Sequence, residues 1–232
     1  MAERPRAPGR PPRDEAPLSR ELVLRAALAV TDRNGLSALS MRAVASSLGV
    51  TPMALYHHVA GKEGLLDLVN EAVWLDVRWP VSRGSARWAA HAKATARAIR
   101  RALRAHPNAV GLVAARPARA PAVLVAFDGL LGSFTRAGFN SRDALFAADT
   151  LGIFTVGHAQ AEFGTSPSAA PERQREDLAN SRESLERAGL THVAAVAQGR
   201  HDYDAEFEFG LEALVAGLTA RRRPRGSTRP AR

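Results

Sequence analysis

The side chains best able to do chemistry together are clustered in residues 41–59, MRAVASSLGVTPMALYHHV. Thr51, Tyr56 and His57 bring a hydroxyl, a phenol and an imidazole close together, and Arg42 adds a guanidinium shortly before them. Groups of this kind, once exposed on one surface, can hydrogen-bond the phosphates and base edges of DNA. Whether these side chains are exposed together therefore depends on the secondary-structure elements that carry them.

The spacing around these side chains predicts two short helices that cross at a steep angle. Ser40 and the pair Thr51-Pro52 are N-terminal helix signals, and Gly49 suits the left-handed turn between the helices. The predicted core contacts are Val44, Ala45, Leu48, Val50, Leu55 and Val59. The other face of the second helix then points outward, as a helix entering a major groove must; its residues are Thr51, Pro52, Met53, Ala54, Tyr56 and His57.

From about Leu22 to Asp67 the sequence resembles the tetracycline-repressor (TetR) family. That family is marked by a glycine after the first helix, an arginine early in the second, LGV before the third, and LYxHVxxKxxLL after it. The residues in these places are Gly35, Arg42, Leu48, Gly49, Val50, Leu55, Tyr56, His58, Val59, Lys62, Leu65 and Leu66. A weaker resemblance to the tetracycline-binding class continues at 115–117 (ARP), 137–139 (AGF) and 206–218.

This resemblance implies a ligand-responsive, homodimeric transcriptional repressor on a near-palindromic operator in double-stranded DNA. By position, the residues that would meet bases are Arg42, Pro52, Met53 and Tyr56, and those that would touch phosphates are Thr51, Tyr56, His57 and Lys62. Arg42 can donate bidentately to a guanine, and Met53 can contact a thymine methyl group. The dimer interface would be built from helices at 141–163 and 202–221 of each subunit.

The remaining chain is also predicted to be helical, which gives an all-α fold. Helices are expected at 20–33, 41–48, 52–58, 62–79, 85–105, 108–114, 118–137, 141–163, 173–188 and 202–221. A helix-turn-helix domain would occupy 18–62, and a regulatory ligand-binding and dimerisation domain 63–221. Residues 1–17 and 222–232 are expected to be a basic disordered arm and tail.

Charge and composition limit the possible classes of protein. The formal net charge is +9, but residues 221–232 alone hold six arginines and no acid, so the body of the chain is nearly neutral. There is no cysteine, which excludes disulfides and thiolate metal sites. Without an apolar signal segment or a membrane-length apolar run, the chain is expected to be cytoplasmic, and nucleoid-associated when bound to DNA.

The regulatory domain is expected to bind a small, mainly apolar effector. The predicted contacts are Trp74, Arg78, Trp88, Phe127, Phe134, Phe154 and His158. Tetracycline repressors hold their drug through magnesium, with a histidine after the sixth helix and acids on the eighth. Here Leu112 and Val113 are apolar, and Ala161 replaces an acid. We therefore expect neither a metal site nor another cofactor.

The alternative is a DNA-binding dimer without a small-molecule ligand, which a sealed regulatory core would favour. An enzyme is not predicted, because the sequence holds neither G-x-S-x-G nor H-E-x-x-H and has no catalytic cysteine.

Two residue pairs that contain histidine are not expected to form metal sites. His57 and His58 point about 100° apart on a helix and lack a third ligand. His158 and Glu162 are expected to form an ordinary i,i+4 pair. The effector, the target genes and the sign of regulation stay open.

Overall fold

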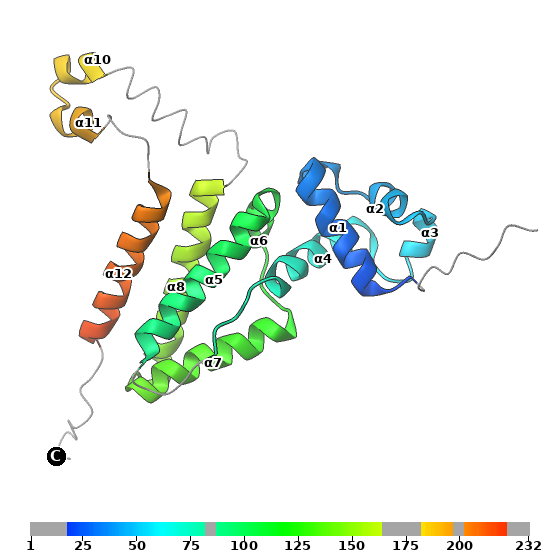
Figure 1. Cartoon of the computed structure of the whole chain (residues 1–232), viewed down its shortest axis with the longest axis horizontal. Helices are drawn as coiled ribbons and strands as arrows, with labels where there is room; N and C mark the ends of the chain where they lie inside the picture. Colours follow the sequence, from blue (N-terminus) through cyan, green and yellow to red (C-terminus); the bar gives the residue numbers. More distant parts are fainter. Residues whose placement is uncertain (1–17, 82–86, 164–181, 197–201, 222–232) are drawn as a thin grey trace, which may run out of the picture.

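The computed structural model describes residues 18–81, 87–163, 182–196 and 202–221. Across these ranges every regular element is a helix, which confirms the predicted all-α fold (Figure 1). The predicted N-terminal arm and C-terminal tail lie outside the described residues. None of the described helices is both long and apolar enough to cross a membrane.

The N-terminal module consists of α1 (Arg20–Asn34), α2 (Met41–Leu48) and α3 (Pro52–Leu55). Each begins at a side-chain cap, because the hydroxyls of Ser19, Ser40 and Thr51 accept hydrogen bonds from the backbone N–H three residues later. Gly49 ends α2 with φ at 69°, a left-handed conformation that costs a residue with a Cβ. The sequence therefore dictates this module locally.

Helix α4 (Gly61–Leu75) is shorter than the predicted 62–79. Beyond it the chain turns so that Val77 is buried and Trp79 stacks on Trp74, with ring centroids 6.1 Å apart and planes 8° apart. Pro80 disfavours helical backbone at Trp79, and the stacked indoles replace the lost helical turns with aromatic contact. The predicted helix end at Trp79 was therefore wrong.

The regulatory helices are α5 (Trp88–Ala105), α6 (Val110–Ala115), α7 (Pro121–Ala137), α8 (Ser141–Phe163), α10 (Arg182–Arg187), α11 (Thr191–Val196) and α12 (Tyr203–Arg221). Helix α7 starts three residues later than predicted, since Pro121 occupies the first helical position and needs no N–H partner there. Only α10 is described from the helix predicted at 173–188, and α11 was not predicted.

The buried residues form two clusters that share the long helix α5. The first runs without interruption from α1 and α4 into α6, so the N-terminal module has no separate core. The second holds α7, α8 and α12 against α5 around the rings of Trp88, Phe134 and Phe139, whose centroids lie 5.2–5.5 Å apart. A movement in the regulatory domain can therefore reach the N-terminal module through packed side chains.

Helix α12 lies beside α8 and α5 and is held partly by charge (Figure 1). Arg97 donates to both carboxylate oxygens of Glu208, at 2.8 and 2.6 Å, and this contact lowers the pKa of Glu208. Gly210 faces Phe154 so closely that a Cβ there would lie 2.7 Å from its ring. The ring of Phe207 stacks on Phe154, with centroids 5.4 Å apart.

Candidate DNA-binding surface and effector cavity

The predicted DNA contacts lie together on one exposed face of α2, α3 and the start of α4. Met53 is 71% exposed and Tyr56 is 56% exposed, although both are large and partly apolar. Arg42, Thr51, Pro52, His57 and Lys62 are also exposed, and Ala54 is half-buried. Side chains of this size that stay in water without an intramolecular role mark an interaction surface.

The inner face of the same helices explains why these residues point outward. Val44 and Leu55 are fully buried, and Ala45 is nearly so, which fixes α3 across α2. The chain leaves α3 in a tight turn, where the N–H of Tyr56 donates to Met53 and that of His58 donates to Leu55. His58 is half-buried behind this surface, so the two adjacent histidines do not form a site together.

The positive side chains of this face are not neutralised by neighbouring acids in the described part of the chain. Within the described residues, neither Arg42 nor Lys62 has a carboxylate partner. Lys62 stands in the first turn of α4, whose N-terminus has no side-chain cap and so presents unsatisfied backbone N–H groups. The neighbouring Glu63 pairs with Arg116 from the segment after α6, which leaves Lys62 uncompensated. This arrangement can bind a phosphate.

A polar junction fixes α1 and the end of α4 to the end of α5. His106 lies between two carboxylates, with Nδ1 at 3.0 Å from Asp32 and Nε2 at 2.9 Å from Asp76. Asn108 donates to the backbone carbonyls of Thr31 and Asp32, which are among the last carbonyls of α1. Sequence reasoning missed this junction because its partners lie far apart in the chain.

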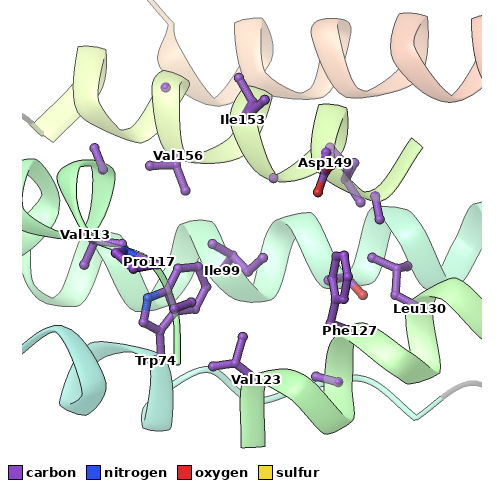
Figure 2. Close-up of a pocket in the computed structure, with 18 of the residues that line it drawn as sticks. Trp74, Ile99, Val113, Pro117, Val123, Phe127, Leu130, Asp149, Ile153 and Val156 are labelled. Atoms are coloured by element: carbon purple, nitrogen blue, oxygen red, sulfur yellow. The ribbon is translucent and has the colours of Figure 1, made fainter. Parts of the chain in front are cut away.

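A cavity of about 640 Å³ opens between α4, α5, α7 and α8 (Figure 2). The described residues that line it are mainly aromatic and aliphatic, and their only polar side chains apart from the two indoles are Thr95, Asp149 and Gln160. The labelled lining residues in Figure 2 are Trp74, Ile99, Val113, Pro117, Val123, Phe127, Leu130, Asp149, Ile153 and Val156. A space of this size and character can hold a drug-sized apolar molecule.

The structure places two of the predicted effector contacts, Trp74 and Phe127, on this cavity. Trp88 and Phe134 lie elsewhere, inside the second core cluster, where they pack on one another. Arg78 is exposed beyond the end of α4 and does not line the cavity.

Phe154 and His158 turn toward α12, on the opposite side of α8 from the cavity, where both rings meet Phe207. The cavity residues that sequence reasoning missed include Trp79 and Asp149. For Trp79, the sequence signal was the proline directly after it, which indicates that the helix ends before this indole. Nothing in the local sequence marks Asp149 as a cavity residue.

His158 and Glu162 form the predicted i,i+4 pair, but inside a larger buried cluster. Nδ1 of His158 is 3.6 Å from Glu162, and Nε2 is 3.4 Å from Glu206. Burial and the nearby Arg100 guanidinium lower the pKa of His158, and the two glutamates oppose that shift without overcoming it. The described residues include no group of three or more His, Asp or Glu side chains placed to hold a metal ion.

The cavity does not fit the magnesium-dependent recognition of tetracycline repressors. Val113 presents an isopropyl group to the cavity in the region where those proteins use a histidine, and Leu112 is buried. Of the lining residues within the described ranges, Asp149 is the only acidic one, and none is a histidine. A single carboxylate is a poor donor set for Mg²⁺ without further ligand oxygens.

Comparison with known proteins agrees with this architecture. Residues 23–69 match the bacterial regulatory proteins of the tetR family, and residues 80–222 match the tetracyclin repressor-like C-terminal domain. An HTH-type transcriptional regulator of Saccharopolyspora erythraea is 32% identical over 210 residues, which cover 88% of this chain and 85% of the relative. The class C tetracycline repressor of Escherichia coli is 33% identical over 202 residues, which cover 87% of this chain and 90% of the relative.

The three-dimensional likeness is equally extensive. The crystal structure of the Streptomyces coelicolor TetR family protein ActR in complex with actinorhodin has a TM-score of 0.77 and 29% identity, and the match covers 90% of this chain and 98% of that one. Matches thus extend over the N-terminal module and the regulatory helices alike, in a family of non-enzymatic transcription factors. The chain belongs to the TetR family of bacterial transcriptional regulators.

Proposed function

We propose that this protein is a dimeric repressor that binds a near-palindromic operator and is released from it by a small, mainly apolar effector. The observation that carries this proposal is the position of α4. Its N-terminus brings Lys62 to the exposed DNA-binding face, and its C-terminal half brings Trp74 to the cavity. One rigid helix therefore touches both sites.

On DNA, we assign base contacts to Arg42, Pro52, Met53 and Tyr56, with Ala54 on the same face. Phosphate contacts fall to Thr51, His57 and Lys62, with the Tyr56 hydroxyl as a further donor. The exposure of this face and the absence of carboxylate partners for its cations support the assignment. Phosphate contacts fix the orientation of the module, and base contacts supply its specificity.

Apolar side chains on α8 and α12 that would otherwise lie in water support the proposed homodimer. Phe146 and Ile153 on α8 and Phe209 on α12 are exposed. Pairing α8 and α12 with their copies would bury such side chains and fix the distance between two α3 helices. The operator half-sites should then be about one helical turn, roughly 34–36 Å, apart.

The wall of the cavity is mechanically linked to α4. Asn70 donates to the carbonyl of Pro117 at 3.0 Å, and the adjacent Arg116 is ion-paired with Glu63 and Asp67 on α4. An effector that displaces Trp74 or Pro117 therefore moves α4 and the helix-turn-helix on it. Release requires that the effector bind the DNA-incompetent arrangement more tightly than the competent one.

The lining supports an aromatic effector bound without a metal. Two relatives are known by small-molecule names: the class C protein is a tetracycline repressor, and ActR was solved with actinorhodin. A sealed core would favour the alternative of a DNA-binding dimer without a ligand, and the cavity of about 640 Å³ argues against it. EDTA should leave effector-induced DNA release unchanged.

The DNA assignment is tested by Arg42→Ala and Tyr56→Ala on an operator fragment selected from genomic DNA. Each should weaken binding by about 1–3 kcal/mol without affecting dimerisation. Arg101→Ala is the matched control, because Arg101 is exposed on α5 and lies outside the proposed face. Unchanged operator affinity in both test variants, measured by fluorescence anisotropy, would refute the assignment.

The effector assignment is tested with Trp74→Ala. Compounds that raise the melting temperature of the wild-type protein should also release the operator, since a ligand stabilises the folded state that it binds. The Trp74→Ala variant should need a higher compound concentration for release but keep its operator affinity within a few-fold. Equal release concentrations for wild type and variant would count against the cavity as the effector site.

A further inference from the structure

The side chains that line the effector cavity give it a negative charge. Among the described residues that line it, Asp149 on α8 is the only charged one, and none of them is a lysine, arginine or histidine. Figure 2 shows the Asp149 carboxylate on the cavity side of α8, across from Phe127. A carboxylate in an otherwise apolar cavity gives that cavity a negative potential.

This carboxylate has no protein partner among the described residues. Its neighbours on the cavity lining are Ala148, Gly152 and Ile153, none of which can neutralise it. Arg142, on the same helix, places its guanidinium over the ring of Phe146, at 5.2 Å from the centroid. The carboxylate is exposed on the single subunit, where no described side chain solvates it.

The aromatic side chains of the lining also favour a positively charged ligand. Trp74 and Trp79 are stacked nearly parallel, and both border the cavity. The faces of indole rings attract cations as well as flat aromatic groups. A molecule with a flat ring system and a protonated amine would find a partner for each part.

From these features we infer that the effector is an amphipathic cation: a planar aromatic body lies along the Trp74 and Trp79 wall, and a protonated amine meets Asp149. This inference rests on the proposed effector site and narrows its ligand class. A carboxylate in the ligand would be repelled by Asp149 and has no basic group on the lining to meet. The ligand class is thus selected by charge sign as well as by shape.

The size of the preference follows from the exposure of Asp149. Exposed ion pairs contribute about 0.2–1 kcal/mol, so an amine should bind about 1.4- to fivefold more tightly than a neutral isostere. The repulsion of an acidic isostere should add a factor of similar size in the other direction. Added salt should reduce both effects.

Three anthracene probes of equal size separate charge from shape: 9-(aminomethyl)anthracene, 9-anthracenemethanol and 9-anthracenecarboxylate. Their dissociation constants for the full-length protein are measured at pH 7.5 by fluorescence titration. The wild type should bind them in the order amine, alcohol, acid. Asp149→Asn should narrow the spread, leaving only the part that the indole faces contribute, and Asp149→Lys should reverse the order.

Asp128→Asn is the matched control, since Asp128 is exposed on α7 and does not line the cavity. This variant should keep the wild-type order. Equal binding of all three probes by the wild type, or a spread that Asp149→Asn leaves unchanged, overturns the charge inference but leaves an aromatic effector site in place. Failure of all three probes to bind overturns both the inference and the proposed cavity.

Discussion

The buried charge cluster that joins α12 to α5 and α8 gives the most quantitative prediction. Glu162 on α8 is only 6% exposed, and it accepts hydrogen bonds from Arg100 at 2.9 and 2.6 Å and from Arg104 at 2.8 Å. Arg100 is itself buried beneath the ring of Phe207. Among the ion pairs of Arg100 with described residues, Glu162→Ala would leave the one to Asp204, at 2.7 Å.

Removing one partner of a buried ion pair costs about 3–5 kcal/mol, and the remaining contact to Asp204 places the expected loss near the lower end, about 3 kcal/mol. For a chain of this length that corresponds to a fall in Tm of roughly 6–12 °C. Asp204→Ala is the control, because it removes an acid from the same arginines. Asp204 is 65% exposed, so its loss should cost about 1 kcal/mol or less.

The free energy of unfolding is measured by urea titration at pH 7.5 with far-UV circular dichroism. All variants are compared at one protein concentration, since dissociation of a dimer makes stability concentration-dependent. A loss below about 1 kcal/mol for Glu162→Ala, or equal losses for Glu162→Ala and Asp204→Ala, would show that burial does not set the strength of this cluster.

Three further predictions concern single residues. The pKa of His158 is lowered in the folded state, chiefly by burial and by Arg100. The contribution of neutral His158 to the free energy of unfolding should therefore be fully present above the unfolded pKa of about 6.5 and should decrease as the pH falls below that value. His158→Gln should therefore lose less Tm than the wild type between pH 7.5 and pH 5.5, and an equal loss would refute this. Gly49→Ala should cost about 1–2 kcal/mol in urea unfolding through backbone strain alone, because its Cβ would have open space. His106→Ala should raise amide hydrogen exchange in α1 but not in α8, since it removes the contacts to Asp32 and Asp76; uniform exchange changes would contradict this.

Most of the N-terminal module could be predicted because its signals are local, although α3 ends at Leu55 and not at His58 as predicted. Hydroxyl caps at Ser40 and Thr51, proline at the first position of α3 and glycine at the turn each act on the backbone within a few residues. The predicted α2 boundaries are confirmed, and α8 is also found at 141–163. The DNA contacts on this module stay predictions, although their exposure is consistent with the role.

The effector site was harder to predict because the faces of α8 are not distinguished by their composition. Apolar residues lie on more than one face of α8: Ile153 and Val156 line the cavity, and Phe154 packs against α12. Only the packing of α5, α7 and α12 decides which face borders empty space. For the same reason the sequence did not single out Asp149, and the stacking of Trp79 on Trp74 required the chain to leave α4 early.

Selection of binding sites from a random pool of double-stranded DNA tests the central claim most directly. The full-length protein should enrich a two-fold symmetric sequence, with half-site centres about 10–10.5 base pairs apart or a multiple of that spacing. Arg42→Ala should relax the preference at one symmetric pair of positions. Recovery of no enriched sequence, or of a single half-site without a symmetric partner, would contradict a dimeric repressor that reads a near-palindromic operator.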